Sequence, residues 1–254
     1  MPFGSWRTLN TRAARALASA ARRAAITMRA SALLLGVLAW PAVTPAETQQ
    51  ILEGSIRAVL AEQAGRQPNV NALVRLADLH LDLGDERTDP ATRKAAYDEG
   101  AKYAKQALER EERNAQAHYL YAANTGSAAQ LKGMMASALT VADLKAHVRR
   151  ALEIQPNHAP SLHMMGMMLE ELPWFMGGDA QAAVTYLKQA TAADPSYAHA
   201  RLDLARVYVK RQDFAEARKE LLTMLQSAPS MPQTDSDRRH RQEASALLAS
   251  LPKP

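Results

Sequence analysis

Residues 183–229 read AVTYLKQATAADPSYAHARLDLARVYVKRQDFAEARKELLTMLQSAP, and the spacing of small and apolar residues in this stretch predicts the fold. Ala183 recurs as Ala217 and Leu187 recurs as Leu221, each after a step of 34 residues. Apolar residues within each half return at the spacing of one face of an α-helix. The stretch therefore predicts a helix-pair unit that occurs twice in succession.

A 34-residue period with small residues where two helices cross is typical of the tetratricopeptide repeat (TPR). Ala, Leu, Glu, Lys, Arg and Gln dominate the chain and aromatic residues make up only 5% of it, which favours helix throughout. We therefore predict an all-α, TPR-like α-solenoid of about four helix pairs with extra terminal helices. Residues 47–254 are predicted to form this single domain. A hydroxyl and an acid three residues apart, at 140–143, predict the start of one helix.

The repeat contains one irregular step. From Gly166 to Ala205 the distance is 39 residues, so the additional residues lie in the segment LPWFMGGD at 172–179. An apolar, aromatic turn has two interpretations: Trp174 folds back over its own helix pair, or Trp174 and Phe175 anchor a partner. The structural residues predicted for this turn are Gly177, Gly178 and Asp179, with Asp179 and later Asp213 as helix N-caps.

The first 46 residues read as a leader. They hold six Arg, no Lys and no acid, and the apolar run at 32–40 is followed by a small residue, Ala46. This pattern predicts a signal peptide with a basic extension that is removed on export, with Met28 as a possible true start. An organelle transit peptide and an uncleaved anchor are the alternatives. The run is shorter than the roughly 20 residues that span a bilayer, so no transmembrane span is predicted after removal.

Charge and cysteine content exclude several classes of function. The full chain has a net charge of +5, but without the leader 25 basic residues face 26 acidic ones, a net charge of −1. The basic pI therefore comes from the leader, and no nucleic-acid partner is predicted for the rest of the chain. The chain has no Cys, which excludes disulfides, thiolate metal sites, cysteine nucleophiles and a lipid-modified N-terminal cysteine.

The first helix of each pair is expected to line the concave side of the solenoid. Mixed polar and apolar side chains there fit recognition of a protein or peptide, although an ordinary solvated face is the alternative. The residues predicted to bind a partner are Trp174, Phe175, Met167, His163, Tyr119, His199, Arg206 and Lys210, and Gln116 and Leu202 belong to the same expected face.

No catalytic residue, cofactor or metal site is predicted, because the seven His are scattered without paired ligand spacing. The chain is therefore predicted not to be an enzyme. Seven of the 11 Met lie between residues 134 and 176. They are interpreted as filler between helices, with an adaptable apolar surface or a Cu(I) site as alternatives.

Several short motifs resemble the TatT component family of TRAP (tripartite ATP-independent periplasmic) transporters. They are YLYAAN (119–124), LKG (131–133), DLKAHVRRAL (143–152), PNHA (156–159) and GGD (177–179). The resemblance implies a periplasmic TPR subunit that associates with a TRAP solute-binding protein. Members of that family carry a lipid anchor, which this chain cannot form without Cys. The regulators of microtubule dynamics, a eukaryotic TPR group, share part of the same pattern more weakly.

We therefore expect a non-enzymatic periplasmic protein, an accessory component of a TRAP-type uptake system that binds a solute-binding protein or an apolar ligand. The alternatives are a general periplasmic scaffold for envelope complexes and copper handling through the Met cluster. A homo-oligomer is compatible with this reading.

Overall fold

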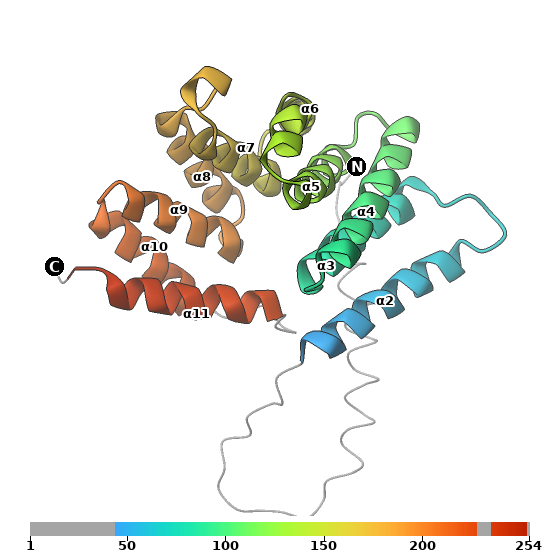
Figure 1. Ribbon diagram of the computed structural model, residues 1–254, viewed down its shortest axis with the longest axis horizontal. Coiled ribbons are helices and arrows are strands. Elements are labelled where there is room, and N and C mark those ends of the chain that lie inside the picture. The colour runs from blue at the N-terminus through green and yellow to red at the C-terminus, as the bar shows by residue number, and fades with distance from the viewer. Residues whose placement is uncertain (1–43, 228–234, 253–254) are drawn as a thin grey trace, which may run out of the picture. The chain divides into compact units, whose positions relative to one another are not determined.

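The computed structural model describes residues 44–227 and 235–252, without the side chains of residues 134–138 and 235–237. All regular structure in these residues is helical, as predicted (Figure 1). The helices are α2 (Pro45–Glu62), α3 (Val70–Glu86), α4 (Pro90–Arg110), α5 (Ala115–Lys132), α6 (Met134–Ile154), α7 (Ala159–Glu171), the 3-10 helix η1 (Trp174–Met176), α8 (Ala180–Ala193), α9 (Ala198–Lys210), α10 (Phe214–Gln226) and α11 (Asp235–Ser250). Helices α3 to α10 pack as four consecutive pairs, with α2 and α11 against the first and last pair.

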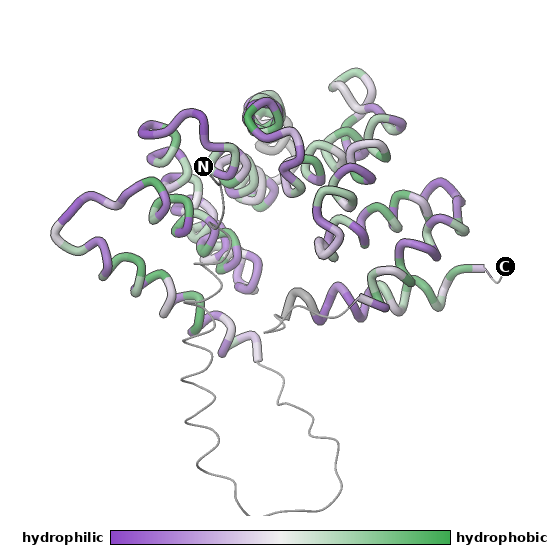
Figure 2. Tube along the Cα trace, turned by 180° about the vertical axis from the view of Figure 1, so that it is seen from behind, coloured by the Kyte–Doolittle hydropathy of each residue, from purple (hydrophilic) through white to green (hydrophobic). Residues whose placement is uncertain are grey.

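The repeated residues form the contacts that the period predicts. Ala183, Leu187, Ala217 and Leu221 are all fully buried. Gly166 faces Leu187 so closely that an added Cβ would lie 2.8 Å from its Cγ. Hydrophobic and hydrophilic residues alternate along the helices in Figure 2, which is the pattern of helices with one buried face.

The first helices of successive pairs form one layer. Helix α3 contacts α5, α5 contacts α7, and α7 contacts α9, whereas within the described chain no comparable contacts join the second helices α4, α6, α8 and α10 to one another. Because the first helices approach each other more closely, they form the inner side of the repeat. We call the side chains that this layer presents, together with those of α11 that meet them, the inner face.

Two predicted boundaries differ from the structure. Helix α6 begins at Met134 rather than at the expected cap near residue 140, because Gly133 takes a φ of 100° and lets the chain reverse immediately after α5. The predicted leader end at Ala46 falls inside the first turn of α2, where Thr44 and Glu47 form a capping box. The rest of the predicted leader lies outside the described residues. No helix among those described is long and apolar enough to cross a membrane.

Candidate functional site

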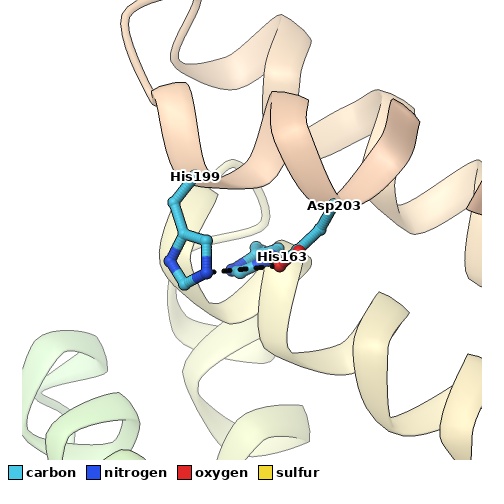
Figure 3. A group of neighbouring side chains, drawn as sticks. All are labelled: His163, His199 and Asp203. Atoms are coloured by element: carbon cyan, nitrogen blue, oxygen red, sulfur yellow. Dashed lines mark hydrogen bonds and ion pairs between the residues drawn. The ribbon is translucent and has the colours of Figure 1, made fainter. Parts of the chain in front are cut away.

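Two histidines and an aspartate meet on the inner face. His163 comes from α7, and His199 and Asp203 come from consecutive turns of α9, so that all three side chains point toward one another (Figure 3). The Nε2 atom of His163 lies 2.7 Å from Oδ2 of Asp203, and the Nε2 atom of His199 lies 3.3 Å from the same oxygen. His163 is buried, whereas the His199 side chain remains 44% exposed. The cluster is therefore open to solvent on the His199 side.

Asp203 is a buried carboxylate surrounded by cationic and hydrogen-bonding groups. Burial by itself raises its pKa, but the hydrogen bond from His163, the neighbouring His199 and the guanidinium of Arg206 lower the pKa to about 2. Arg206 pairs with Oδ1 of Asp203 and also with Glu243 of α11. Asp203 is therefore ionised at neutral pH, and both of its oxygens are engaged.

Tyrosines extend this network along the inner face. The Nδ1 atom of His163 lies 3.2 Å from the hydroxyl of Tyr197, and the ring of Tyr119 on α5 meets the ring of His158, at the start of α7, edge to face at 5.7 Å between centroids. Burial raises the pKa of both tyrosines, so both hydroxyls are protonated at neutral pH. The chain of contacts thus connects α5, α7 and α9.

His158 adds a second link between α5 and α7. Its Nε2 atom lies 2.8 Å from Oε1 of Gln116, and its Nδ1 atom lies 2.8 Å from Oγ of Ser161. Burial lowers the pKa of His158 to about 4, so the ring is neutral at physiological pH. A neutral ring satisfies both contacts by donating to the amide oxygen and accepting from the hydroxyl.

Helix α11 brings the far end of the chain back to the inner face. The ring of His240 stacks on that of His199 at 4.6 Å between centroids. Arg239 reaches the other end of the repeat, where its Nη2 atom lies 3.4 Å from Oε1 of the buried Glu86 on α3. Helix α11 therefore contacts the last helix pair through His240 and the first helix pair through Arg239.

The structure gathers four of the predicted partner-binding residues on the inner face: Tyr119, His163, His199 and Arg206. Met167 packs against the apolar core between α8 and α10, and Lys210 forms an ion pair with Glu170. Leu202 is fully buried and lines no open face. The partner role of these residues stays a prediction.

Asp203 is the residue of the cluster that sequence reasoning missed. The 39-residue offset between first helices places position 202 opposite His163, so position 203 is its neighbour on the next helix. Asp203 also follows His199 by four residues, which puts both on one helical face. Combining the offset with the helical spacing would have found the cluster.

The aromatic turn between α7 and α8 exposes its two aromatic side chains to solvent. Trp174 is 85% exposed and Phe175 is 70% exposed, and their rings meet edge to face at 5.9 Å. Trp174 thus does not fold back over its own helix pair, the first of the two interpretations. Their proposed role as an anchor stays a prediction.

The three turn residues are fixed by backbone geometry. Gly177 has a φ of 84°, and a Cβ on Gly178 would lie 1.8 Å from the carbonyl oxygen of Leu172. Asp179 caps α8 by accepting from the amides of Gln181 and Ala182. Both glycines and the cap are therefore needed for the sharp re-entry into α8.

The family model for regulator of microtubule dynamics protein 1-3 matches residues 46–173, half of the chain. The chain belongs to this family. A tetratricopeptide repeat model matches residues 175–234, so the two models together cover the repeat region.

The relatives agree with the regulator of microtubule dynamics family. Regulator of microtubule dynamics protein 1 from Pongo abelii is 28% identical over 210 residues, covering 76% of this chain and 66% of the relative. The protein of the same name from Homo sapiens is 28% identical over 195 residues, covering 70% and 61%. The chain thus spans slightly less than two thirds of the length of these relatives.

A solved structure supports the fold alone. The thermophilic TPR protein TTC0263 from Thermus thermophilus superposes with a TM-score of 0.56 at 17% identity, covering 81% of this chain and 91% of the other. A TPR fold supports protein–protein interaction, which is the general part of the predicted partner.

The expected relationship to TRAP transporters is wrong, because the family model and the relatives name a different family. Two residues of the motifs behind that resemblance have structural roles. Asn124 is fully buried and donates to the carbonyl of Ala77, and Asp179 is a helix cap. Residues with such structural roles do not identify a partner.

The functional predictions that depended on the transporter family are therefore wrong too. These are the TRAP accessory role, the solute-binding protein partner and the periplasmic location, since the matching relatives come from mammals. The envelope scaffold loses its basis with that location. Copper handling loses its basis as well, because Met165 is buried and Met164 and Met168 pack in the core around α7 and α8.

Proposed function

We propose that this chain is a non-catalytic scaffold that regulates microtubule dynamics by holding a segment of a protein partner against its inner face. The microtubule part of the proposal comes from the name of its relatives. The binding part comes from the TPR fold, which presents side chains of successive helices on one surface.

The observation that carries the proposal is the concentration of polar and aromatic groups on the inner face. Tyr119, His163, Tyr197, His199 and Arg206 come from three successive repeat units, and His163, Tyr197, His199 and Arg206 are joined through contacts at His163 and Asp203. Such groups offer donors, acceptors and flat rings to a bound segment. Packing of the repeat requires small and apolar residues, so this set fits a binding role better than a structural one.

Co-sedimentation of the full chain with polymerised tubulin tests the proposal, with microtubule growth and shrinkage rates as a second readout. Arg206→Ala is expected to weaken binding at least fivefold, because the half-exposed guanidinium lies on the inner face. Arg150→Ala is the matched control, since Arg150 also bridges two carboxylates, Glu112 and Glu153, but lies on the second helix α6. Equal effects of both changes, or no effect of the chain on microtubules, would contradict the proposal.

A second contact with the same partner is proposed at Trp174 and Phe175. An exposed Trp beside an exposed Phe offers a large apolar surface of the kind that dominates protein interfaces. Trp174→Ala is expected to reduce partner binding without changing the melting temperature. Ile51→Ala, another exposed apolar residue, serves as the control. Loss of binding in the control alone would contradict this assignment.

A further inference from the structure

The inner-face cluster has the composition and spacing of a metal site. One ligand atom each from His163, His199 and Asp203 can be chosen so that all three lie within 4.8 Å of one another. Imidazole nitrogen and carboxylate oxygen are ligands for Zn²⁺ at about 2.0–2.2 Å, which places neighbouring ligand atoms about 3.4 Å apart. The Nε2 atom of His199 lies 3.3 Å from Oδ2 of Asp203, close to that value. The Nε2 atom of His163 lies 2.7 Å from the same oxygen, at hydrogen-bond distance, and has to move outward to admit an ion. Small side-chain rotations would therefore form a three-ligand shell.

The surroundings of the cluster already orient the ligands. The Nδ1 atom of His163 faces the hydroxyl of Tyr197 at 3.2 Å, so its N–H can be donated there while Nε2 faces the ion. Metal-binding histidines usually have such a partner on the second nitrogen. Arg206 holds the other oxygen of Asp203 and fixes the carboxylate plane. Asp203 is only 4% exposed, so the carboxylate has little freedom to turn away.

We propose that His163, His199 and Asp203 bind one divalent transition-metal ion of the zinc class, with an open coordination position toward the solvent side of the inner face. Two histidines and one carboxylate leave at least one position for water or for a side chain of a partner. The positive charge of Arg206 beside Asp203 repels a bound metal ion and lowers the affinity of the site for it. The metal site does not depend on the microtubule proposal, since its failure leaves the partner experiments unchanged.

Titration of the full chain with Co²⁺ tests the site, with visible absorption as the readout and Zn²⁺ as competitor. Any polyhistidine tag must be removed first. One equivalent of Co²⁺ is expected to give d–d absorption bands that stoichiometric Zn²⁺ abolishes. His163→Gln and Asp203→Asn are each expected to weaken binding at least tenfold.

His199→Gln tests the site in a variant that is expected to fold, because this half-exposed side chain can change without disturbing the core. It is expected to weaken Co²⁺ binding at least tenfold at an unchanged circular dichroism spectrum. His147→Gln is the matched control, since His147 lies 2.8 Å from His118 in another histidine pair. Absence of the absorption bands, their persistence in folded His199→Gln, or their loss in His147→Gln would overturn the proposal.

Discussion

At the scale of single residues, the inner face depends on buried polar groups that have one favourable protonation state. His158 is the clearest case, because both ring nitrogens have partners in the neutral form and burial lowers its pKa to about 4. The unfolded chain, with a histidine pKa of about 6.5, takes up the proton more readily. The folded state is therefore favoured above pH 6.5 and loses stability as the pH falls toward 4.

This linkage predicts a pH-dependent stability. Between pH 7.5 and pH 5 the free energy of unfolding is expected to fall by about 2 kcal/mol through His158, because the unfolded chain binds the extra proton. Urea unfolding of the chain and of His158→Gln at both pH values measures the contribution as a difference between the two proteins. Parallel pH dependence in both proteins would contradict it.

Two helical glycines differ in the space around them. A Cβ on Gly100 would lie 2.2 Å from Oδ1 of Asn124, whose amide is held by hydrogen bonds to the carbonyls of Ala77 and Leu120. A Cβ on Gly54 would meet nothing within 4 Å. The same substitution should therefore have opposite effects at the two sites.

Gly54→Ala is expected to stabilise the chain by about 0.5–1 kcal/mol, the ordinary gain for a helix interior. Gly100→Ala is expected to destabilise it by about 1–3 kcal/mol, because Asn124 cannot move without breaking its hydrogen bonds. Thermal unfolding of the two variants measures both changes in stability. A gain in stability from Gly100→Ala would show that the contact with Asn124 gives way easily.

At the scale of elements, similar sequence signals produce different helix starts. Asp179 and Asp213 both occupy N-cap positions, as the sequence predicts. Only Asp179 accepts amide hydrogens with its side chain, at 3.0 Å from both nitrogens. The N-cap position can be read from residue type, but the side-chain bond depends on how the preceding turn enters the helix.

Asp179→Ala is expected to cost about 1 kcal/mol of stability, because it leaves two amides of α8 without partners. Asp213→Ala, which removes no capping bond, is expected to change stability by less than about 0.5 kcal/mol. Chemical denaturation of both variants provides the comparison. An equal loss in both would mean that the bond at Asp179 contributes nothing beyond its position.

At the scale of the whole molecule, the last described helix closes the hydrophobic core. Ala244 and Leu251 join the cluster formed by α9 and α10, with Leu247 and Leu248 packed against it. Ala244 is fully buried, whereas Ala246 faces solvent. Terminal helices of this kind protect the exposed end of a repeat array.

Ala244→Asp is expected to destabilise the chain by at least about 2 kcal/mol, because an unpaired buried polar group costs about 1–3 kcal/mol and a buried charge costs more, while Ala246→Asp leaves it nearly unchanged. Limited proteolysis should release α11 first in the buried variant. Resistance to protease and an unchanged melting temperature in Ala244→Asp would show that α11 is not part of the core.

The architecture could be predicted from the sequence because it depends on small and apolar residues that recur every 34 residues. Ala183 and Leu187 predicted buried helix contacts from their recurrence alone, and both are fully buried. The cluster of His163 with Asp203 could not be found by looking for short motifs, since its members are 40 residues apart and meet only through the offset between helices. The predicted family was wrong because part of the resemblance rested on residues such as Asn124, which is buried and has a packing role that does not identify a partner.

The contact between Arg239 and Glu86 joins residues separated by 153 positions, whereas nearly all helix contacts join neighbours along the chain. A repeat of this kind can fold pair by pair as it leaves the ribosome. The contact of His240 on α11 with His199 forms only after all four helix pairs have been synthesised, because α11 follows them in the chain. A nascent chain therefore holds all four helix pairs before α11 completes the inner face.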